Sequence, residues 1–475
     1  MRFVDREDEL KLLTDHLTRP GAGMFVLYGR RRIGKTALLH RAIGSLPRTA
    51  YHVGTRSTPT EEMRRLSETL AAAWSIPLLA AQPLASFAAL LALLEGIDGP
   101  AVLVLDELPY LLESEPALPG MLQAAWDQAL SRSQLKLVLC GSSVGMMENA
   151  FFSPGSPLFG RRTGQLRLGP LAPQHLAGVF DWSLPEIIEL AALFGGVPGY
   201  LQRLDPTLDL ATNLRRHVLT RGEPLYEEVP FLLREELREP RVYNAILASI
   251  AAGARKFSEL SSKVGLDRAN LTRYLGVLAG LGLVEREVPV TERQPEKSRK
   301  GLYRIADPFV ATSFAFVHPF RDELERGLAD QVMASRVAPQ LHIYLSRAVE
   351  PVLRDLFLAG FAAEDVPFRP FLGGRHWSPT AELDLVLLEE TRRHAFIAEL
   401  KWAAEAVSTA LLDGLRDRVA REPAFAGVEC TFALVSRAGF AGSRKLAADE
   451  RLIDLSLALE TRAPGSSPQS ARHRG

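Results

Sequence analysis

The chain has 475 residues, of which 47% are hydrophobic and 24% are charged, and its formal net charge at neutral pH is zero. This length and composition predict a globular protein of roughly two to four domains, and the zero net charge excludes a whole-chain field that would attract DNA or a membrane. The two cysteines, Cys140 and Cys430, lack the spacing of a zinc site or a disulfide framework, so we expect a reducing, cytoplasmic location.

The two ends of the chain and its longest apolar run predict no membrane segment. The first ten residues are charged and lack the apolar core of a signal peptide. The apolar run at residues 84–96 is too short to cross a bilayer. From Thr461 onward the sequence is rich in Pro, Ser and Arg, which predicts a disordered tail over residues 461–475.

An apolar run at residues 24–28 predicts a strand that leads into a loop and a helix. The loop reads GRRRIGKT and fits the phosphate-binding pattern G-x-x-x-x-G-K-[ST]. Its backbone N–H groups and the helix N-terminus can hold phosphate oxygens. Lys35 would reach the β- and γ-phosphates of ATP and the Thr36 hydroxyl would bind Mg²⁺, whereas the alternative is an ordinary glycine-rich turn. The predicted nucleotide-binding residues of this stretch are Gly29, Arg30, Arg31, Arg32, Ile33, Gly34, Lys35, Thr36 and Ala37.

The fully apolar run at residues 101–105 predicts a buried parallel strand, and Asp106 and Glu107 follow it. Ligands of open α/β sheets bind at the carboxyl ends of such strands. Asp106 would hold Mg²⁺ and contribute to the nucleotide site, and Glu107 would polarise the attacking water. The alternative is a pair of carboxylates that caps the next helix.

Two later stretches contain further candidates for ATP hydrolysis. A strand at residues 135–140 ends before Ser142 and Ser143, either of which could sense the γ-phosphate or cap the next helix. Arg161 and Arg162 precede another strand. Arg161 is a candidate arginine finger, acting in cis or on a neighbouring subunit, and the alternative is a solvated basic turn.

The ordered motifs FVDREDEL, GRRRIGKT, LVLDELPY, LCGSS, PLFGRR and GGVPGYL resemble those of archaeal-type ATPases of the STAND/AAA-related P-loop class. The resemblance covers about residues 1–233 and implies an ATP-hydrolysing core over residues 1–175 with a helical lid over residues 176–238. It also implies that residues 6–10 lie near the adenine and that Pro198 lies close to the nucleotide. Residues 7–17 also read as an amphipathic helix.

Residues 239–312 contain three short helices and two strands around a basic loop, which looks like a winged helix. Ser258 and Asp267 are the predicted N-caps of its second and third helices. Between residues 253 and 304 eleven Lys and Arg outnumber six Asp and Glu, an excess that suits contact with a DNA backbone. The alternative is a switch arm that packs on the nucleotide module. The candidate DNA-binding residues on the outer face of the third helix are Arg268, Asn270 and Arg273.

After a helical linker at residues 313–339, Asp384 and the Glu399-x-Lys401 pair lie on two successive predicted strands. They fit the D…E-x-K core of restriction-endonuclease-like domains, and the order of elements over residues 340–460 matches that core. In such a site Asp384 and Glu399 hold Mg²⁺ and Lys401 orients the water, and a helix glutamate such as Glu350 commonly joins them. The alternative is an inert fold that binds nucleic acid or protein.

Together these features predict an α/β protein with a P-loop parallel sheet, a helical lid, a winged helix and a restriction-endonuclease-like α/β domain. We expect ATP and Mg²⁺ as cofactors, and an ATPase whose nucleotide state controls the winged helix and a nuclease-like domain that acts on DNA. The alternative function is a STAND-type regulatory or signalling ATPase with an inert C-terminal domain. The residues leave open DNA against RNA and a monomer against a homo-oligomer.

Overall fold

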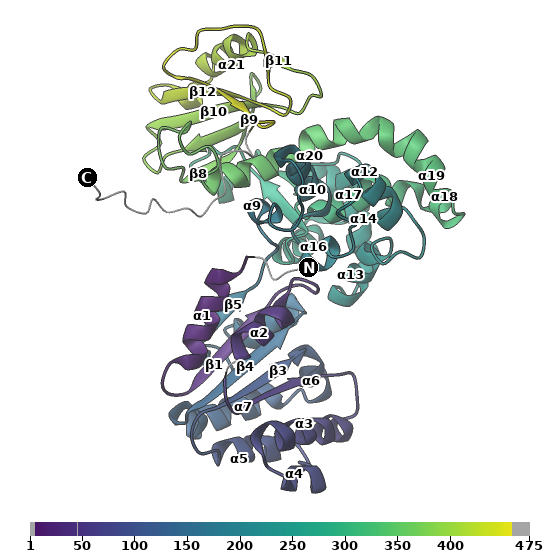
Figure 1. Ribbon diagram of the computed structural model, residues 1–475, viewed down its shortest axis with the longest axis vertical. Coiled ribbons are helices and arrows are strands. Elements are labelled where there is room, and N and C mark those ends of the chain that lie inside the picture. Colours follow the sequence, from purple (N-terminus) through teal and green to yellow (C-terminus); the bar gives the residue numbers. More distant parts are fainter. Residues whose placement is uncertain (1–4, 45, 458–475) are drawn as a thin grey trace, which may run out of the picture. The chain divides into compact units, whose positions relative to one another are not determined.

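The computed structural model describes residues 5–44 and 46–457, which form two compact units (Figure 1). Among the described residues, the first unit contains those up to Pro170, Val197–Gln202 and Phe231–Pro240, and the second contains the others. The predicted disordered tail, 461–475, lies outside the described residues. Across the described ranges, no helix has the length and hydropathy needed to span a membrane.

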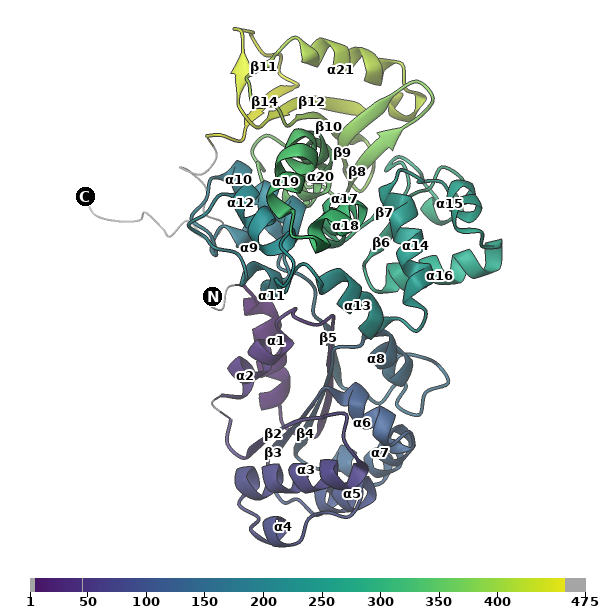
Figure 2. The ribbon, with the colours of Figure 1, turned by 90° about the vertical axis from the view of Figure 1, so that its right-hand side faces the viewer.

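A parallel sheet with the strand order β2-β3-β4-β1-β5 forms the centre of the first unit. Every residue of β1, β3 and β4 is buried, as expected for apolar strands covered on both faces. Helices α1 and α2 lie on one face, and α6, α7 and α8 on the other (Figure 2). The strands are β1 (Gly23–Tyr28), β2 (Thr49–Val53), β3 (Ala101–Asp106), β4 (Leu135–Gly141) and β5 (Gly164–Arg167).

The helices of the first unit begin near the residues that the sequence indicates. The predicted amphipathic helix is α1, with Leu13 and Leu17 buried. The helix after the glycine-rich loop is α2, which has Gly34 at its N-cap. The helices are α1 (Glu7–Thr18), α2 (Lys35–Ile43), α3 (Pro59–Trp74), α4 (Leu78–Ala81), α5 (Phe87–Glu95), α6 (Leu108–Ser114), α7 (Leu118–Gln128), α8 (Val144–Phe151) and α11 (Pro198–Leu201); α13 (Glu228–Glu236) begins in the second unit and ends in the first.

Three helices and a two-stranded sheet form the predicted winged-helix segment in the second unit. The Asp267 carboxylate caps α16 by accepting the Asn270 N–H at 2.9 Å, as predicted. The prediction for Ser258 is wrong: α15 begins at Phe257, and the Glu259 carboxylate accepts the N–H groups that precede the helix. The elements are α14 (Pro240–Ala251), α15 (Phe257–Val264), α16 (Arg268–Gly280), and the antiparallel strands β6 (Val284–Glu287) and β7 (Leu302–Ile305).

Helix α10 (Leu184–Phe194) packs against α17 (Pro308–Phe316) and α20 (Ala338–Leu358) within the second unit. Phe194 and Phe309 stack with their ring centroids 6.2 Å apart, and both side chains are fully buried. Residues that the sequence assigns to a lid (α10) and to the end of the winged helix with the start of the linker (α17) therefore share one hydrophobic core. The shorter helical elements of this unit are α9 (Pro173–Leu176), α12 (Leu210–Asn213), α18 (Arg321–Glu325) and α19 (Ala329–Val332).

The C-terminal sheet is mixed, with the order β14-β12-β10-β9-β8. Strands β8 to β10 are antiparallel, and β10, β12 and β14 are parallel. Helices α20 and α21 cover its opposite faces (Figure 2). The predicted α/β fold class is confirmed. The elements are β8 (Leu372–Trp377), β9 (Glu382–Leu388), β10 (His394–Lys401), α21 (Leu411–Ala420), β12 (Glu429–Ser436), β14 (Glu450–Asp454) and the short pair β11 (Val407–Ser408) with β13 (Phe440–Ala441).

The loop after β6 docks on the first strand of the C-terminal sheet. The Val290 N–H donates to the Arg375 carbonyl at 2.9 Å, and the Thr291 hydroxyl lies 2.9 Å from Nδ1 of His376. The His376 side chain is buried beside the Glu422 carboxylate at 3.1 Å. The loop between β6 and β7 is thus joined to the C-terminal sheet by backbone and side-chain hydrogen bonds.

Phe309→Ala should destabilise the second unit by about 3–5 kcal/mol, because it removes a fully buried ring from the core between α10 and α17. Phe371→Ala is the matched control, since that ring is 59% exposed and its loss should cost under about 0.5 kcal/mol. Urea unfolding followed by circular dichroism measures both values. Equal midpoints for the two variants would contradict the assignment of this core.

Candidate nucleotide-binding site and C-terminal acidic cluster

The glycine-rich loop leaves the carboxyl end of β1 and enters α2. Gly29 approaches the chain beyond β5 so closely that a Cβ atom there would lie 2.4 Å from the Leu168 carbonyl oxygen. Gly34, at the N-cap of α2, has a φ of +98°, and residues with a side chain rarely adopt this backbone conformation. Arg32, between them, also has a positive φ of +64°. The two glycines of the pattern are therefore required by the path of the backbone.

The Lys35 side chain folds back across this loop. Its ammonium donates to the carbonyl oxygens of Gly29 at 2.8 Å and Arg30 at 3.0 Å, and the side chain is 6% exposed. Burial lowers the pKa of Lys35, and the nearby Asp106 and Glu107 carboxylates partly oppose that shift. A buried ammonium held between loop carbonyls is positioned to receive an anionic group at the loop.

Thr36 and Asp106, the two predicted Mg²⁺ ligands of the loop and the sheet, lie next to each other. The Thr36 hydroxyl donates to the Asp106 carboxylate at 3.3 Å, and the Tyr51 hydroxyl donates to the same oxygen. Burial and this hydrogen bond raise the pKa of Tyr51. The sequence analysis missed Tyr51, because it stands in the middle of β2 and no motif marks it.

Glu107 and Ser142 also come together at the carboxyl edge of the sheet. The Ser142 hydroxyl donates to the Glu107 carboxylate at 2.6 Å. Glu107 has a left-handed backbone, with a φ of +50°, a conformation that costs about 1–3 kcal/mol for a residue with a side chain. This contact distinguishes Ser142 from Ser143, which stands at the N-cap of α8. Glu107 is also the N-cap residue of α6, but its side chain does not cap that helix. Its carboxylate instead accepts the hydroxyl of Ser142, which follows the neighbouring strand β4.

Segment Val197–Gln202 packs on the glycine-rich loop. The Gly199 N–H donates to the Arg32 carbonyl at 3.0 Å, and a Cβ on Gly34 would lie 3.9 Å from the Pro198 ring. Pro198 is therefore beside the loop. Arg30 donates to the Tyr200 hydroxyl at 3.5 Å, a further contact that the sequence analysis missed.

Arg6 ties the start of α1 to the segment after β5. It is 7% exposed, donates to the Gly169 carbonyl at 2.6 Å and pairs with Glu9 at 2.8 Å. These contacts show a structural role for Arg6, and the expectation that residues 6–10 lie near the adenine stays a prediction.

Two acidic residues at the end of α13 reach the glycine-rich loop, and the sequence analysis missed both. Glu235 pairs with Arg31 at 3.0 Å. Burial raises the pKa of Glu236 to about 7, and the charges of Arg30, Lys35 and Arg31 oppose that shift. No local pattern marks these glutamates, because they lie about 200 residues beyond the loop in the sequence.

The candidate arginine finger lies elsewhere on the first unit. Arg161 makes a two-pronged ion pair with Asp127, with a shortest distance of 2.8 Å, and it donates to the Pro157 carbonyl at 2.7 Å. Arg162 stacks on Phe152 at 4.4 Å from the ring centroid. The contacts with Asp127 and Pro157 hold the Arg161 side chain away from the glycine-rich loop of its own chain.

The three candidate DNA-binding residues lie on α16 and are exposed. The Asn270 amide donates to the Asp267 carboxylate at 2.7 Å, so it takes part in the helix cap. Arg273 lies over the Tyr274 ring at 4.9 Å. Arg268 and Arg273 therefore leave positive charge on the outer surface of this helix.

In the C-terminal domain, Asp384 and Glu399 lie on the paired strands β9 and β10. The Asp384 carboxylate accepts the Leu400 N–H at 3.0 Å, and burial, followed by the Glu399 charge, raises the pKa of Asp384. Glu399 pairs with Lys401 at 2.7 Å and with Arg418 of α21. The predicted D…E-x-K residues are thus neighbours on one strand pair.

Glu350 of α20 belongs to the same cluster. Burial raises the pKa of Glu350 to about 7, while Arg375 opposes the shift and Asp384 adds to it. Arg375 of β8 forms ion pairs with Glu350 at 3.1 Å and with Glu382. Across residues 5–44 and 46–457, no group of three or more His, Cys, Asp or Glu side chains has the arrangement of a metal site. Arginines that the sequence analysis missed, Arg375 and Arg418, neutralise these carboxylates.

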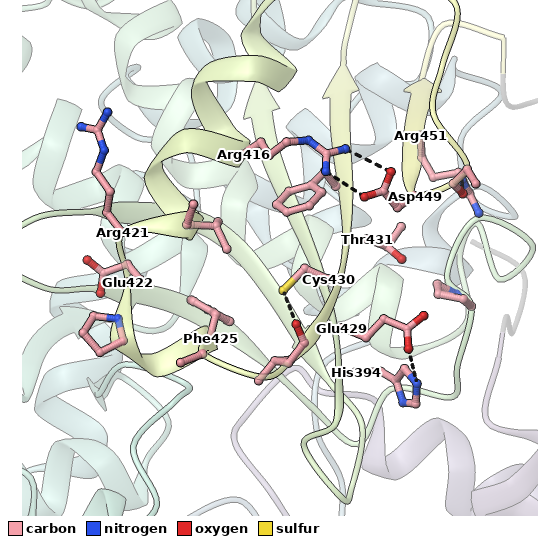
Figure 3. A pocket seen from close by; sticks show the side chains of 18 residues that line it. His394, Arg416, Arg421, Glu422, Phe425, Glu429, Cys430, Thr431, Asp449 and Arg451 are labelled. Atoms are coloured by element: carbon pink, nitrogen blue, oxygen red, sulfur yellow. Dashed lines mark hydrogen bonds and ion pairs between the residues drawn. The ribbon is translucent and has the colours of Figure 1, made fainter.

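A separate cavity of about 940 Å³ lies at the amino ends of β10, β12 and β14, away from the cluster (Figure 3). Arg416 and Asp449 form a two-pronged ion pair there at 2.9 and 3.0 Å, and Arg416 covers the Phe432 ring. Glu389 and Glu429 flank His394 and raise its pKa. Two ion pairs, Arg416 with Asp449 and His394 with Glu429, thus lie among the charged groups of this cavity.

Two family models match parts of the chain. Residues 3–204 match a model described as "ATPase domain predominantly from Archaea", and residues 313–411 match one described as "Archaea bacterial proteins of unknown function". MJECL04, an uncharacterised protein of Methanocaldococcus jannaschii, is 30% identical over 406 residues, which are 84% of this chain and 87% of that protein.

Two solved structures to which the chain is similar share less of its sequence. The Walker-type ATPase PABY2304 of Pyrococcus abyssi is 23% identical, with a TM-score of 0.49, over 66% of this chain and 96% of that one. The Aeropyrum pernix ORC2 protein is 15% identical, with a TM-score of 0.42, over 71% of this chain and 96% of that one.

Gly29→Ala should weaken ATP binding by roughly tenfold or more, because the new Cβ would collide with the Leu168 carbonyl and displace the loop. Gly145→Ala is the control, since a Cβ there meets no atom within 4 Å. Calorimetric titration with ATP measures both affinities. Unchanged affinity of Gly29→Ala, with native circular dichroism, would contradict the role of this close approach.

Proposed function

This chain belongs to the family of archaeal-type P-loop ATPases, and on that premise we propose that its loop at residues 29–36 binds ATP and that Glu107 activates the water that hydrolyses it. The observation that carries the proposal is the pair of hydrogen bonds at the carboxyl edge of the sheet. Thr36 donates to Asp106 at 3.3 Å, and Ser142 donates to Glu107 at 2.6 Å. This edge is where open α/β sheets bind ligands.

The side chains at this edge suit Mg²⁺ as well as phosphate. The Thr36 hydroxyl and the Asp106 carboxylate are oxygen donors, which Mg²⁺ prefers, and they already lie within hydrogen-bond distance. Thr36 and Asp106 would hold the ion, the latter through water. When bound, Mg²⁺ supplies positive charge that offsets the charge on the transferred phosphoryl group.

The remaining groups divide the work of hydrolysis. Lys35 binds the β- and γ-phosphates and offsets their charge, with Pro198 and the loop backbone beside it. Glu107 orients a water whose oxygen attacks the γ-phosphorus as the bond to the β–γ bridging oxygen breaks. The water proton passes to the phosphate through the Glu107 carboxylate. Ser142, bonded to Glu107, couples the position of that carboxylate to the γ-phosphate.

Glu107→Gln should lower the rate of ATP hydrolysis by roughly 10²–10⁴-fold while ATP still binds, because the amide cannot accept the proton. Lys35→Ala should lose both binding and hydrolysis. Glu113→Gln makes the same change on the exposed side of α6 and should keep the wild-type rate. Phosphate release and calorimetric binding separate these outcomes, and a Glu107→Gln enzyme with the wild-type rate would refute the assignment.

We further propose that the nucleotide state controls the winged helix and the C-terminal domain, which act on DNA. Two observations support this. Arg268 and Arg273 place positive charge on the outer face of α16, which suits phosphate contacts. Asp384 and Glu399 lie on the paired strands β9 and β10 beside Lys401, with Glu350 of α20 close to Asp384, and these are the residue types that a metal-dependent nuclease site uses. Asp384, Glu399 and Glu350 would be its metal ligands.

The regulatory alternative, an ATPase with an inert C-terminal domain, also has an observation in its favour. Glu399 is paired with Lys401 and Arg418, and Glu350 with Arg375, so protein cations already neutralise the carboxylates. In either case an Arg161 finger would act on a neighbouring copy of the chain, because Asp127 holds it away from its own loop.

Asp384→Asn should abolish Mg²⁺- or Mn²⁺-dependent cleavage of plasmid DNA and leave ATP hydrolysis unchanged if the cluster is a nuclease site. Asp417→Asn, an equal change on the exposed face of α21, is the control. Gel assays with and without ATP measure cleavage by the two variants and the wild type. Wild-type protein that hydrolyses ATP but never cleaves DNA would establish the regulatory alternative.

A further inference from the structure

Segment Phe231–Pro240 connects the two units and lies on the nucleotide loop of the first. Arg31 of that loop pairs with Glu235 at 3.0 Å, donates to the Tyr110 hydroxyl and lies over the Phe231 ring at 5.7 Å. The segment ends where α14, the first helix of the winged-helix segment, begins. The loop that would bind phosphate is thus in direct contact with the chain that leads to the winged helix.

Glu236 sits within this contact. The charges that act on its carboxylate are those of Arg30, Lys35 and Arg31, and the Val144 N–H at the start of α8 also opposes the rise of its pKa. Among the described residues, Oε2 of Glu236 has no hydrogen-bond partner although the atom is buried. A buried carboxylate oxygen without a hydrogen-bond partner costs free energy of folding. The Glu236 side chain is therefore held in this position by the surrounding positive charges.

Those positive charges are the ones that a triphosphate needs. Lys35 is the residue that reaches the β- and γ-phosphates, and Arg30 and Arg31 flank it in the loop. A polyphosphate at the loop would bring several negative charges to the groups that now stabilise Glu236. Like charges in a partly buried site repel strongly, so an ionised Glu236 and the phosphates compete for one set of cations.

We propose that Glu236 is a built-in competitor of the ATP phosphates, and that ATP binding displaces its carboxylate together with segment Phe231–Pro240. The inference rests on the proposed ATP site and adds the regulation of that site. Because α14 follows the segment directly in the chain, movement of the segment also moves α14, the first helix of the winged helix. The raised pKa of Glu236, about 7, is consistent with this arrangement, because protonation is the other way to remove the competing charge.

Glu236→Gln tests the competition, because it keeps the shape of the side chain and removes its charge. At pH 8, where the wild-type carboxylate is ionised, the variant should bind ATP roughly tenfold more tightly than the wild type. Adenosine, which lacks phosphates, should bind both proteins equally. Glu239→Gln, the same change on an exposed residue of the segment, should leave ATP affinity within about twofold.

The advantage of Glu236→Gln should shrink at pH 6, because a carboxylate with a pKa near 7 is then mostly protonated in the wild type. Comparison with the variant cancels the titration of ATP itself. Hydrogen exchange over residues 231–240 should rise on ATP addition to the wild type. Equal ATP affinity of Glu236→Gln and wild type at pH 8, or protection of this segment by ATP, would overturn the inference; a wild type that binds no ATP at any pH would instead overturn the proposed function.

Discussion

The parallel register of β1, β3 and β4 fixes the positions of the site groups that leave the carboxyl ends of these strands. Tyr28 pairs with Gly141, and Leu105 pairs with Leu139, so the three strands end in one layer. Hydrogen bonding along buried apolar strands holds that layer, and the loop, Asp106, Glu107 and Ser142 all leave from it. The short contacts between Thr36 and Asp106 and between Ser142 and Glu107 follow from this alignment.

The sequence predicted the groups that leave each strand end, because local patterns encode them. The glycine-rich loop and the Asp-Glu pair are examples, the Asp267 cap is a similar local pattern at the start of a helix, and the resemblance to archaeal-type ATPases is confirmed. The groups that arrive from elsewhere could not be predicted. Contacts between segments that are far apart in the sequence give Tyr51, Glu236 and Arg375 their roles. Such contacts leave no local pattern in the sequence. The error at Ser258 was local: the helix already begins at Phe257, with Lys256 as the N-cap residue, and the Glu259 carboxylate accepts the N–H groups of Arg255 and Lys256.

The wing and the acidic cluster form one electrostatic system. Arg375 joins Glu350 and Glu382, and it also lies 3.9 Å from Glu287 in β6. Its backbone carbonyl accepts the Val290 N–H of the wing. Partly buried charges of this kind are stable only as a set, because removing one partner leaves another uncompensated. The loop between β6 and β7 therefore contributes to the electrostatic environment of the cluster.

The path of the chain through the two units also limits which domain exchanges the fold can tolerate during evolution. The chain leaves and re-enters the first unit, since segments Val197–Gln202 and Phe231–Pro240 return to it after α10 and α12. The ATPase family model ends at residue 204, yet α10 buries its apolar side chains, Ile187, Ile188 and Leu190 among them, with helices that begin more than 100 residues later. A recombination event that joined another domain at residue 204 would expose the apolar face of α10 to solvent. Any domain that replaced the C-terminal half would therefore have to cover the apolar side chains of α10.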